Sequence, residues 1–334
     1  MTRKVLLSLD GGGVKGLFAL NLLVLIKDCL NINLYETFSL VVGSSVGAII
    51  AALLAFGMLD DEESDNIMDR VLSLTEKLFQ GRDLLKALLN SMYDGNEKTN
   101  ALKELFGDRK LGDKDLKVPL CIIVTRINGE AKYLCSWNEA DSDITIAEAL
   151  DASSSAPIYF PPVKIKDSYF IDGGCTSNNP IGATLLASLK ISPNDLNIKI
   201  LSLGTRVLSS HVPESENTVK NMGLIKWISM NIINVLMGVN NNTEQLLAEQ
   251  LIGKKNVLRV SCNVIASLDK LNSKTIDALV CETLRVWQEN AAEITDFISA
   301  SDNKLSVTST CTNYLDKLHK SVNNSKVKEC VNFI

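Results

Sequence analysis

A pentapeptide rich in glycine and serine, Gly43-Ser-Ser-Val-Gly47, stands where an apolar run meets an apolar, helix-forming stretch. It fits the G-x-S-x-G pattern, in which small flanking residues permit the strained turn that lifts a serine hydroxyl out of the fold. The same turn would put Ser45 at the N-terminus of a helix, where the helix dipole favours developing negative charge. The segment therefore predicts a nucleophilic serine at position 45. The competing interpretation is a Gly/Ser turn that simply opens a core helix.

An earlier segment, residues 10–16, carries three consecutive glycines between a predicted strand and a predicted helix. It matches the dinucleotide fingerprint G-x-G-x-x-G, and Glu36 lies about where a ribose contact belongs, roughly 20 residues further on. Adjacent glycines also bring backbone N–H groups close to a ligand at a helix N-terminus, which favours any anion, a transient oxyanion included. The segment leaves three interpretations open: a cofactor site, an oxyanion hole and a plain tight turn.

A serine hydroxyl is unreactive at neutral pH unless a base accepts its proton. The chain has two histidines, His211 and His319, and both lie in polar sequence typical of a protein surface. Asp172 is the better candidate, because it follows the predicted strand 168–171 and precedes two glycines, so that its carboxylate would emerge from a sheet edge into a tight turn. An ordinary Asp-Gly turn residue is the alternative.

Strands and helices must alternate to position these segments, and the N-terminal two-thirds of the sequence has that pattern. The early strands are near-continuous apolar runs, as expected when helices cover both faces of a parallel sheet. Strands are predicted at 5–9, 39–42, 118–126, 133–136, 168–171 and 198–203, and helices at 17–30 and 46–56. The alternation predicts a layered α/β fold.

The sequence predicts helices in two further regions. Between residues 60 and 112 the sequence becomes charged and apolar residues recur at helical spacing, which predicts an insertion that could flank or cover the site. From residue 222 onward the chain is again mostly helical. Its apolar stretch 223–238 could lie at a lipid interface, although a core or dimer-contact helix is the preferred interpretation. The sequence leaves the oligomeric state open.

The composition narrows the choice of partners and cofactors. Acidic residues outnumber basic ones by 39 to 34, which gives a net charge of −5 and argues against nucleic acid, whose binding depends on Lys and Arg. Two histidines exclude a histidine-rich metal site, and the sequence contains no EF-hand loop. We therefore expect no metal and no other cofactor.

Two apolar stretches partly resemble a signal peptide and a transmembrane helix. Residues 5–9 follow Arg3 and Lys4, but this run is shorter than the roughly 7–15 apolar residues of a signal peptide. Residues 40–59 contain no charge and are long enough to span a membrane, yet the Gly/Ser cluster divides them into a strand, a turn and a buried helix. We expect a cytoplasmic protein, with no signal peptide or transmembrane helix, that meets membranes only at their surface.

Taken in order, the segment 10–16, the pentapeptide around Ser45 and the Asp172-Gly-Gly turn strongly resemble the motifs of the patatin-like phospholipase family. Secondary stretches agree with the family at 152–162, 178–180 and 201–205. The resemblance covers roughly residues 4–206 and carries no motif beyond them.

The resemblance implies a three-layer fold in which helices flank a mostly parallel central sheet. It implies one patatin-like domain over residues 1–334, with a motif-bearing core at about 4–206. The helical insertion would occupy about 60–112, and the mostly helical C-terminal region about 222–334.

The resemblance also implies a lipid acyl hydrolase that cleaves fatty acyl esters of phospholipids or related lipids at a membrane or micelle surface, without a catalytic histidine. Ser45 would be the nucleophile and Asp172 the general base. The predicted oxyanion hole comprises Gly11, Gly12, Gly13 and Lys15, and the elbow glycines are Gly43 and Gly47. Two other functions stay open: a non-catalytic storage or interaction protein on the same scaffold and, with less support, a dinucleotide-binding oxidoreductase.

Overall fold

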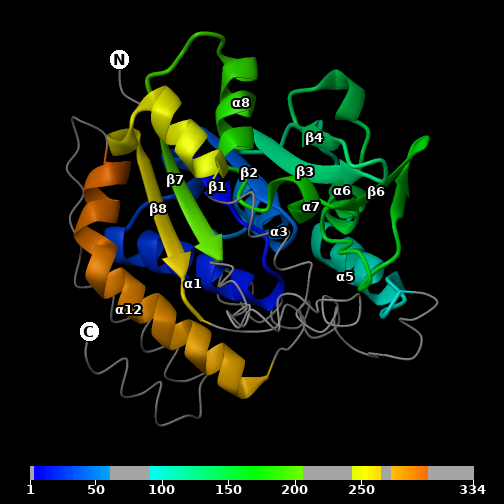
Figure 1. Ribbon diagram of the computed structural model, residues 1–334, viewed down its shortest axis with the longest axis horizontal. Helices are drawn as coiled ribbons and strands as arrows, with labels where there is room; N and C mark the ends of the chain where they lie inside the picture. Colours follow the sequence, from blue (N-terminus) through cyan, green and yellow to red (C-terminus); the bar gives the residue numbers. More distant parts are fainter. Residues whose placement is uncertain (1–3, 61–90, 206–242, 265–271, 300–334) are drawn as a thin grey trace, which may run out of the picture.

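A mostly parallel sheet runs through the part of the chain that the computed structural model describes, residues 4–60, 91–205, 243–264 and 272–299 (Figure 1). Its strands lie in the order β5-β6-β3-β2-β1-β7-β8, and β4 pairs with β3. The strands are β1 Lys4–Leu9, β2 Leu40–Ser44, β3 Leu120–Arg126, β4 Ala131–Cys135, β5 Val163–Ile165, β6 Ser168–Asp172, β7 Ile198–Thr205 and β8 Val257–Cys262.

Helices cover both faces of this sheet. They are α1 Gly16–Leu30, α2 Leu34–Thr37, α3 Val46–Ala55, α5 Asn96–Phe106, α6 Ile146–Ser153, α7 Gly174–Ser177, α8 Ile181–Ile191 and α12 Ser273–Ile298, with a further helical segment at 243–252. Alternate residues of β1 show the layering: Leu7 packs in the cluster that contains α1, α3 and α12, whereas Leu6 packs in the cluster that contains α8 and residues 243–252. This period of two is the geometry of a strand buried on both faces. The predicted three-layer α/β fold is confirmed.

The central strands pair in parallel, and after β1 and β2 a helix returns the chain to the other end of the sheet. β1 pairs in parallel with β2 and β7, β2 with β3, and β7 with β8. The carboxyl ends of β1 and β2 therefore meet at one edge of the sheet, where the glycine segment and the serine segment begin.

Strand β6 brings a third segment to the same place. Val124 and Thr125 of β3 pair with both β4 and β6, so these two antiparallel strands occupy opposite edges of β3. β2 pairs with β3 as far as Ser44↔Ile123, and β6 continues along the same edge with Asp172↔Val124. The end of β2 and the end of β6 consequently face each other, which places the sequence after Ser44 beside Asp172.

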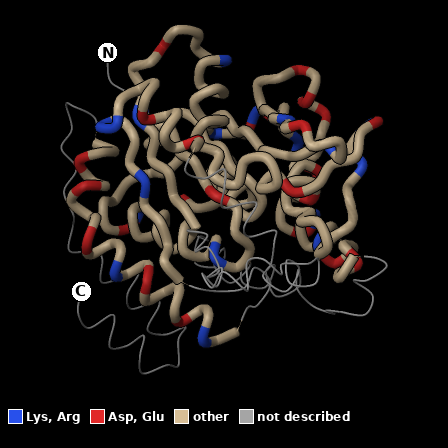
Figure 2. Tube along the Cα trace, in the orientation of Figure 1, with Lys and Arg blue, Asp and Glu red and all other residues tan. Residues whose placement is uncertain are grey.

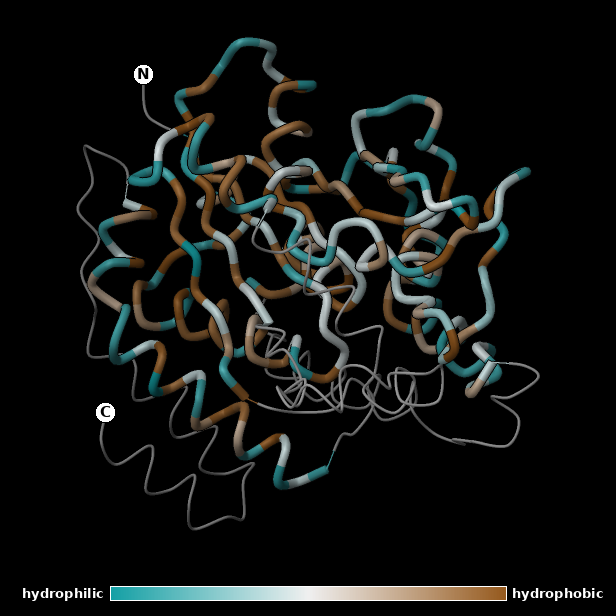
Figure 3. The backbone as a smooth tube through the Cα atoms, in the orientation of Figure 1, coloured by the Kyte–Doolittle hydropathy of each residue, from teal (hydrophilic) through white to brown (hydrophobic). Residues whose placement is uncertain are grey.

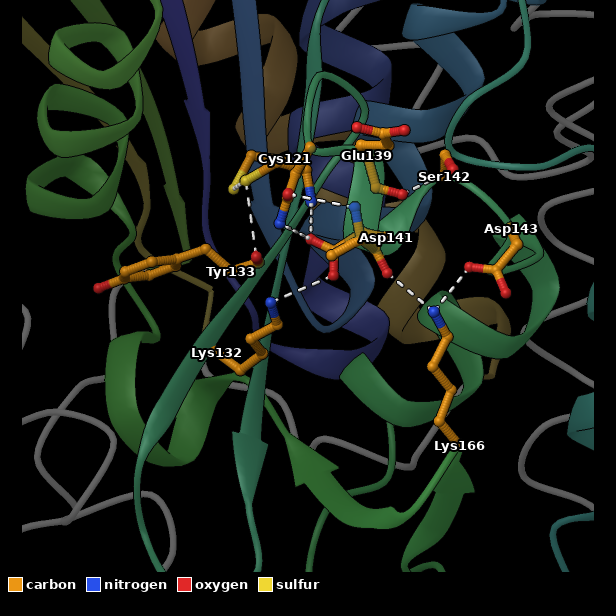
Figure 4. Close-up of polar contacts among 11 residues, drawn as sticks. Cys121, Lys132, Tyr133, Glu139, Asp141, Ser142, Asp143 and Lys166 are labelled. Atoms are coloured by element: carbon orange, nitrogen blue, oxygen red, sulfur yellow. Dashed lines mark hydrogen bonds and ion pairs between the residues drawn. The ribbon is translucent and has the colours of Figure 1, made fainter.

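Charged residues lie mostly on the surface of the fold, and its interior is mostly apolar. Figure 2 shows Lys, Arg, Asp and Glu spread over the outer helices and loops, with both signs along α12. In Figure 3 the tube of α12 alternates between hydrophilic and hydrophobic colours, as expected for a helix with one face against the core. Lys132 of β4 pairs with Asp141 at 3.1 Å, and Lys166, in the turn between β5 and β6, pairs with Asp143 at 2.7 Å (Figure 4).

The structure adds detail to several predictions. The uncharged stretch 40–59 divides into β2 and the buried helix α3, as expected. Within the described residues, no helix combines the length and the apolar character that crossing a bilayer requires. Two strands were not predicted, the short β5 and the edge strand β8 in the C-terminal region. His211, His319 and the stretch 223–238 lie outside the described residues, as does the part of the predicted insertion at 61–90.

Candidate active site

Ser45 occupies the turn between β2 and α3 with φ 54° and ψ −126°, a conformation that non-glycine residues rarely adopt. Two glycines let the chain make this turn, because their backbones press against neighbouring strands and helices. A Cβ on Gly43 would overlap the carbonyl oxygen of Gly47, and a Cβ on Gly47 would overlap that of Leu9. The surrounding packing thus holds the strained turn and exposes the Ser45 side chain at the sheet edge.

The Ser45 hydroxyl donates a hydrogen bond to Asp172, with 2.7 Å between Oγ and Oδ2. The other carboxylate oxygen of Asp172 accepts a 2.7 Å hydrogen bond from the Gly174 N–H. Asp172 is 1% exposed, and burial raises the pKa of its carboxyl to about 6, although the hydrogen bonds from Ser45 and Gly174 and the charge of Lys98 act in the opposite direction. A carboxylate with this pKa is a better proton acceptor than a solvated one.

The C-terminal end of α6 holds the backbone on both sides of this pair. Ser153 accepts a 3.0 Å hydrogen bond from the Ser45 N–H through its Oγ, and that hydroxyl donates to the Ile123 carbonyl at 2.6 Å. The Asp172 N–H donates to the Ser155 carbonyl at 2.9 Å, and the Gly173 N–H donates to the Ser153 carbonyl at 3.0 Å. One short segment therefore fixes the spacing between the serine and the carboxylate.

The glycine loop lies directly against the serine elbow, since a Cβ on Gly11 would come within 3.2 Å of the Ser45 Cβ. The Gly11 N–H donates to the Asn178 carbonyl at 3.0 Å, so this amide is already engaged. Gly12 has φ 150° and leaves no room for a side chain beside Thr205, whose hydroxyl donates to the Gly11 carbonyl. Within the described ranges, no acceptor pairs with the N–H of Gly12 or Gly13.

Lys15, at the other end of the loop, is 5% exposed. Burial lowers the pKa of its ammonium group, whereas the neighbouring Cys262 and Asp10 act to raise it. A cationic side chain at this position would add positive potential beside the free amides of the loop.

A buried ion pair anchors the start of the loop. Arg259 of β8 donates from Nη1 to Asp10 Oδ1 at 2.6 Å, and its Nη2 contacts Asp10 Oδ2. The same Nη1 donates to the Ser202 hydroxyl at 2.6 Å, and the Thr205 N–H donates to Asp10 at 3.3 Å. Burial raises the pKa of the Asp10 carboxyl, and Arg259 opposes that shift. The loop is thereby tied to two strands that come much later in the chain.

The structure brings together the residues that the sequence patterns singled out: the serine, the aspartate, the glycine loop and both elbow glycines. It also adds residues that sequence reasoning missed, namely Arg259, Ser153 and Lys98. One signal could have indicated Arg259, because it is a charged residue within the otherwise apolar run 257–262. A group of three His, Cys, Asp or Glu side chains that could hold a metal is absent from the described part of the chain.

The arrangement contains the parts that serine-hydrolase chemistry requires: a hydroxyl on a strained elbow, a buried carboxylate in contact with it, and a glycine loop that packs against the elbow. A family model described as patatin-like phospholipase matches residues 7–185. The chain is 26% identical over 272 residues to a cUMP-AMP-activated phospholipase of Escherichia coli, covering 76% of this chain and 80% of that protein.

Other similar proteins match over part of their length. A cGAMP-activated phospholipase of Vibrio cholerae is 29% identical over 232 residues, which are 60% of this chain and 63% of that protein, so the match spans less than two-thirds of it. A calcium-independent phospholipase A2-gamma of Mus musculus is 24% identical over 308 residues, covering 85% of this chain and 38% of that protein. The crystal structure of VipD from Legionella pneumophila aligns with a TM-score of 0.36 at 15% identity, covering 99% of this chain and 84% of that one.

Proposed function

Since the chain belongs to the patatin-like phospholipase family, we propose that it hydrolyses fatty acyl esters of phospholipids or related lipids through an acyl-enzyme on Ser45. The observation that carries the proposal is the 2.7 Å hydrogen bond from the Ser45 hydroxyl to the buried carboxylate of Asp172. The names of the similar phospholipases support the substrate class.

In the first half-reaction Asp172 accepts the Ser45 proton while Oγ attacks the ester carbonyl carbon. A C–Oγ bond forms, and the carbonyl electron pair moves onto oxygen. The amides of Gly12 and Gly13 stabilise that oxyanion, since Gly11 is engaged with Asn178 and serves to shape the loop.

Collapse of the tetrahedral intermediate breaks the bond to the alcohol, which leaves with the proton held by Asp172. Water then occupies the vacated side, Asp172 accepts a proton from it, and hydroxide attacks the acyl carbon. The second intermediate expels Ser45, which recovers its proton, and the fatty acid leaves. A single carboxylate thus serves as base and acid in turn.

The positive charge of Lys15 contributes to stabilising the oxyanion in both half-reactions, because a cation beside the amides lowers the energy of the developing negative charge.

We further propose that residues 1–334 form one domain. The lipid substrate would be reached at a membrane or micelle surface.

The decisive experiment is labelling by a fluorophosphonate probe, combined with release of fatty acid from phospholipid vesicles. We expect both signals in the wild type and neither in Ser45→Ala, whereas Asp172→Asn should abolish turnover. His211→Ala and His319→Ala should keep full activity; loss of activity in either variant, with the fold retained, would point to a triad instead.

The assay is run with and without cUMP-AMP and cGAMP, because these nucleotides activate the similar phospholipases according to their names. A chain that neither reacts with the probe nor releases fatty acid under any of these conditions would be a non-catalytic member of the family. A rise in melting temperature with NAD(P) or FAD would favour the dinucleotide-binding alternative.

A further inference from the structure

Lys98 is a buried lysine that no step of the proposed reaction uses. It lies in α5, within the predicted insertion that carries none of the family motifs, and its side chain is 1% exposed. A buried ammonium group needs several hydrogen-bond partners to offset the loss of hydration. Its partners therefore indicate what holds it in the interior.

Among the described residues, the polar partners of the ammonium group come from Asp151, near the C-terminal end of α6, and from Ser155, two residues after that helix. Nζ lies 3.0 Å from Asp151 Oδ1, 2.8 Å from the Asp151 carbonyl oxygen and 2.7 Å from the Ser155 hydroxyl. The ring of Phe160 lies against the cation, with 4.4 Å from Nζ to the ring centroid. A cation is well placed here, because the carbonyl groups at the end of a helix carry negative partial charge.

The segment that Lys98 binds is the segment that holds the candidate catalytic pair. The Ser155 carbonyl accepts the Asp172 N–H, while Ser153 accepts both the Ser45 N–H and the Gly173 N–H. Lys98 and the backbone of the candidate catalytic pair thus lie on two sides of one short, mostly buried turn.

We propose that Lys98 is a positioning residue for the Ser45–Asp172 pair: its ammonium group fixes the end of α6 against the elbow, and its charge favours the ionised form of the base. This inference rests on the function proposed above. It assigns the predicted insertion a part in building the site, in addition to any part in covering it.

The charged groups around the base give the sign of the effect. Within the described residues, the positive charge of Lys98 on α5 interacts with the Asp172 carboxyl. The Cys175 thiol of α7 lies near the same carboxyl. Burial raises the pKa of this thiol to about 12, so the thiol stays neutral. Burial raises the pKa of Asp172, whereas the positive charge of Lys98 lowers it. Asp151 and Asp172 in turn oppose the burial that lowers the pKa of Lys98. Removing the cation should raise the pKa of Asp172.

The test is the pH dependence of kcat/KM, whose acid limb reports the base of the free enzyme. Lys98→Met should move this limb upward by about half a unit to one unit, less than for a charge in direct contact with the carboxylate. Lys98→Arg, which keeps the positive charge, should return the limb to its wild-type position.

Lys132→Met is the matched control, because it also removes a lysine from a pair with a buried aspartate, Asp141, at 3.1 Å, but on the opposite edge of β3 (Figure 4). It should lose stability without moving the acid limb. If Lys98→Met leaves the Asp151 charge without its cation and does not fold, Lys98→Met/Asp151→Asn removes both charges, and a smaller upward movement is expected because the Asp151 anion opposes the effect of Lys98.

A folded Lys98→Met or double variant with an unmoved acid limb would overturn the inference. A second readout, titration of the Asp172 carboxyl by ¹³C NMR, does not depend on turnover. An inactive wild type that shows no Ser45 labelling would refute the proposed function, whereas an Asp172 titration that is the same in wild type and Lys98→Met would refute the role of Lys98.

Discussion

Replacing Asp172 with asparagine should make the protein more stable at neutral pH while abolishing hydrolysis. Burial raises the pKa of this carboxyl from 3.8 to about 6. The shift of roughly two units corresponds to about 3 kcal/mol of folding free energy at 1.36 kcal/mol per unit. The ionised carboxylate is thus held in the folded state at a cost that a neutral amide of nearly the same shape avoids.

The direction in which the folding stability changes with pH follows from proton binding to Asp172. A carboxyl with a raised pKa binds its proton more tightly in the folded state, so its stabilising contribution is full below pH 3.8 and is lost as the pH rises through about 6. Wild type should therefore lose up to about 3 kcal/mol relative to Asp172→Asn between acidic and neutral pH, roughly half of it between pH 5 and pH 8.

Urea unfolding of both proteins at pH 5 and pH 8 measures this difference. Asp143→Asn is the control, because Asp143 is exposed and its hydrogen bond with Lys166 lowers its pKa, so no gain at pH 8 is expected. If Asp172→Asn and wild type keep the same difference in unfolding free energy at both pH values, the carboxyl is not the destabilised base described above.

Three other substitutions probe the supports of the site. Arg259→Met should lower the free energy of unfolding by about 3–5 kcal/mol, because it leaves the buried Asp10 carboxylate unpaired, and Asp10→Asn should recover part of that loss in the double variant. Ser153→Ala should lower kcat with a smaller change in KM, and its unfolding free energy should fall by about 1–3 kcal/mol for the unsatisfied Ser45 amide; unchanged kcat would contradict the role of the α6 turn. Gly12→Ala should lower hydrolysis sharply, because the new methyl group overlaps Thr205 and displaces the loop; full activity, measured with a soluble ester, would exclude this loop as the oxyanion hole.

The sequence was most informative where a local pattern encodes a local shape. The glycine loop, the serine elbow and the Asp172 turn each carry their own glycines, because close backbone approach or a strained turn requires them at fixed spacing. The early strands were equally visible, since β1 and β2 are buried on both faces apart from the exposed Lys4 and are mostly apolar. Their predicted and observed bounds differ by one or two residues.

The contacts that support the site could not be predicted, because they join segments that are distant in the sequence. Arg259 is 249 residues from Asp10, and Lys98 is 53 residues from Asp151. Neither belongs to a motif, and a lysine in a charged, helix-period stretch is normally solvated. Only the packing of α5 on α6 turns Lys98 into a buried cation.

The most direct test of the Ser45–Asp172 mechanism is the identification of the acylated residue during turnover. Hydrolysis of a fatty acyl ester is quenched in acid, the protein is digested, and the peptides are analysed by mass spectrometry. We expect the acyl group on Ser45, with no acylated peptide from Asp172→Asn. Acylation of a different residue, or steady hydrolysis by Ser45→Ala, would contradict the mechanism.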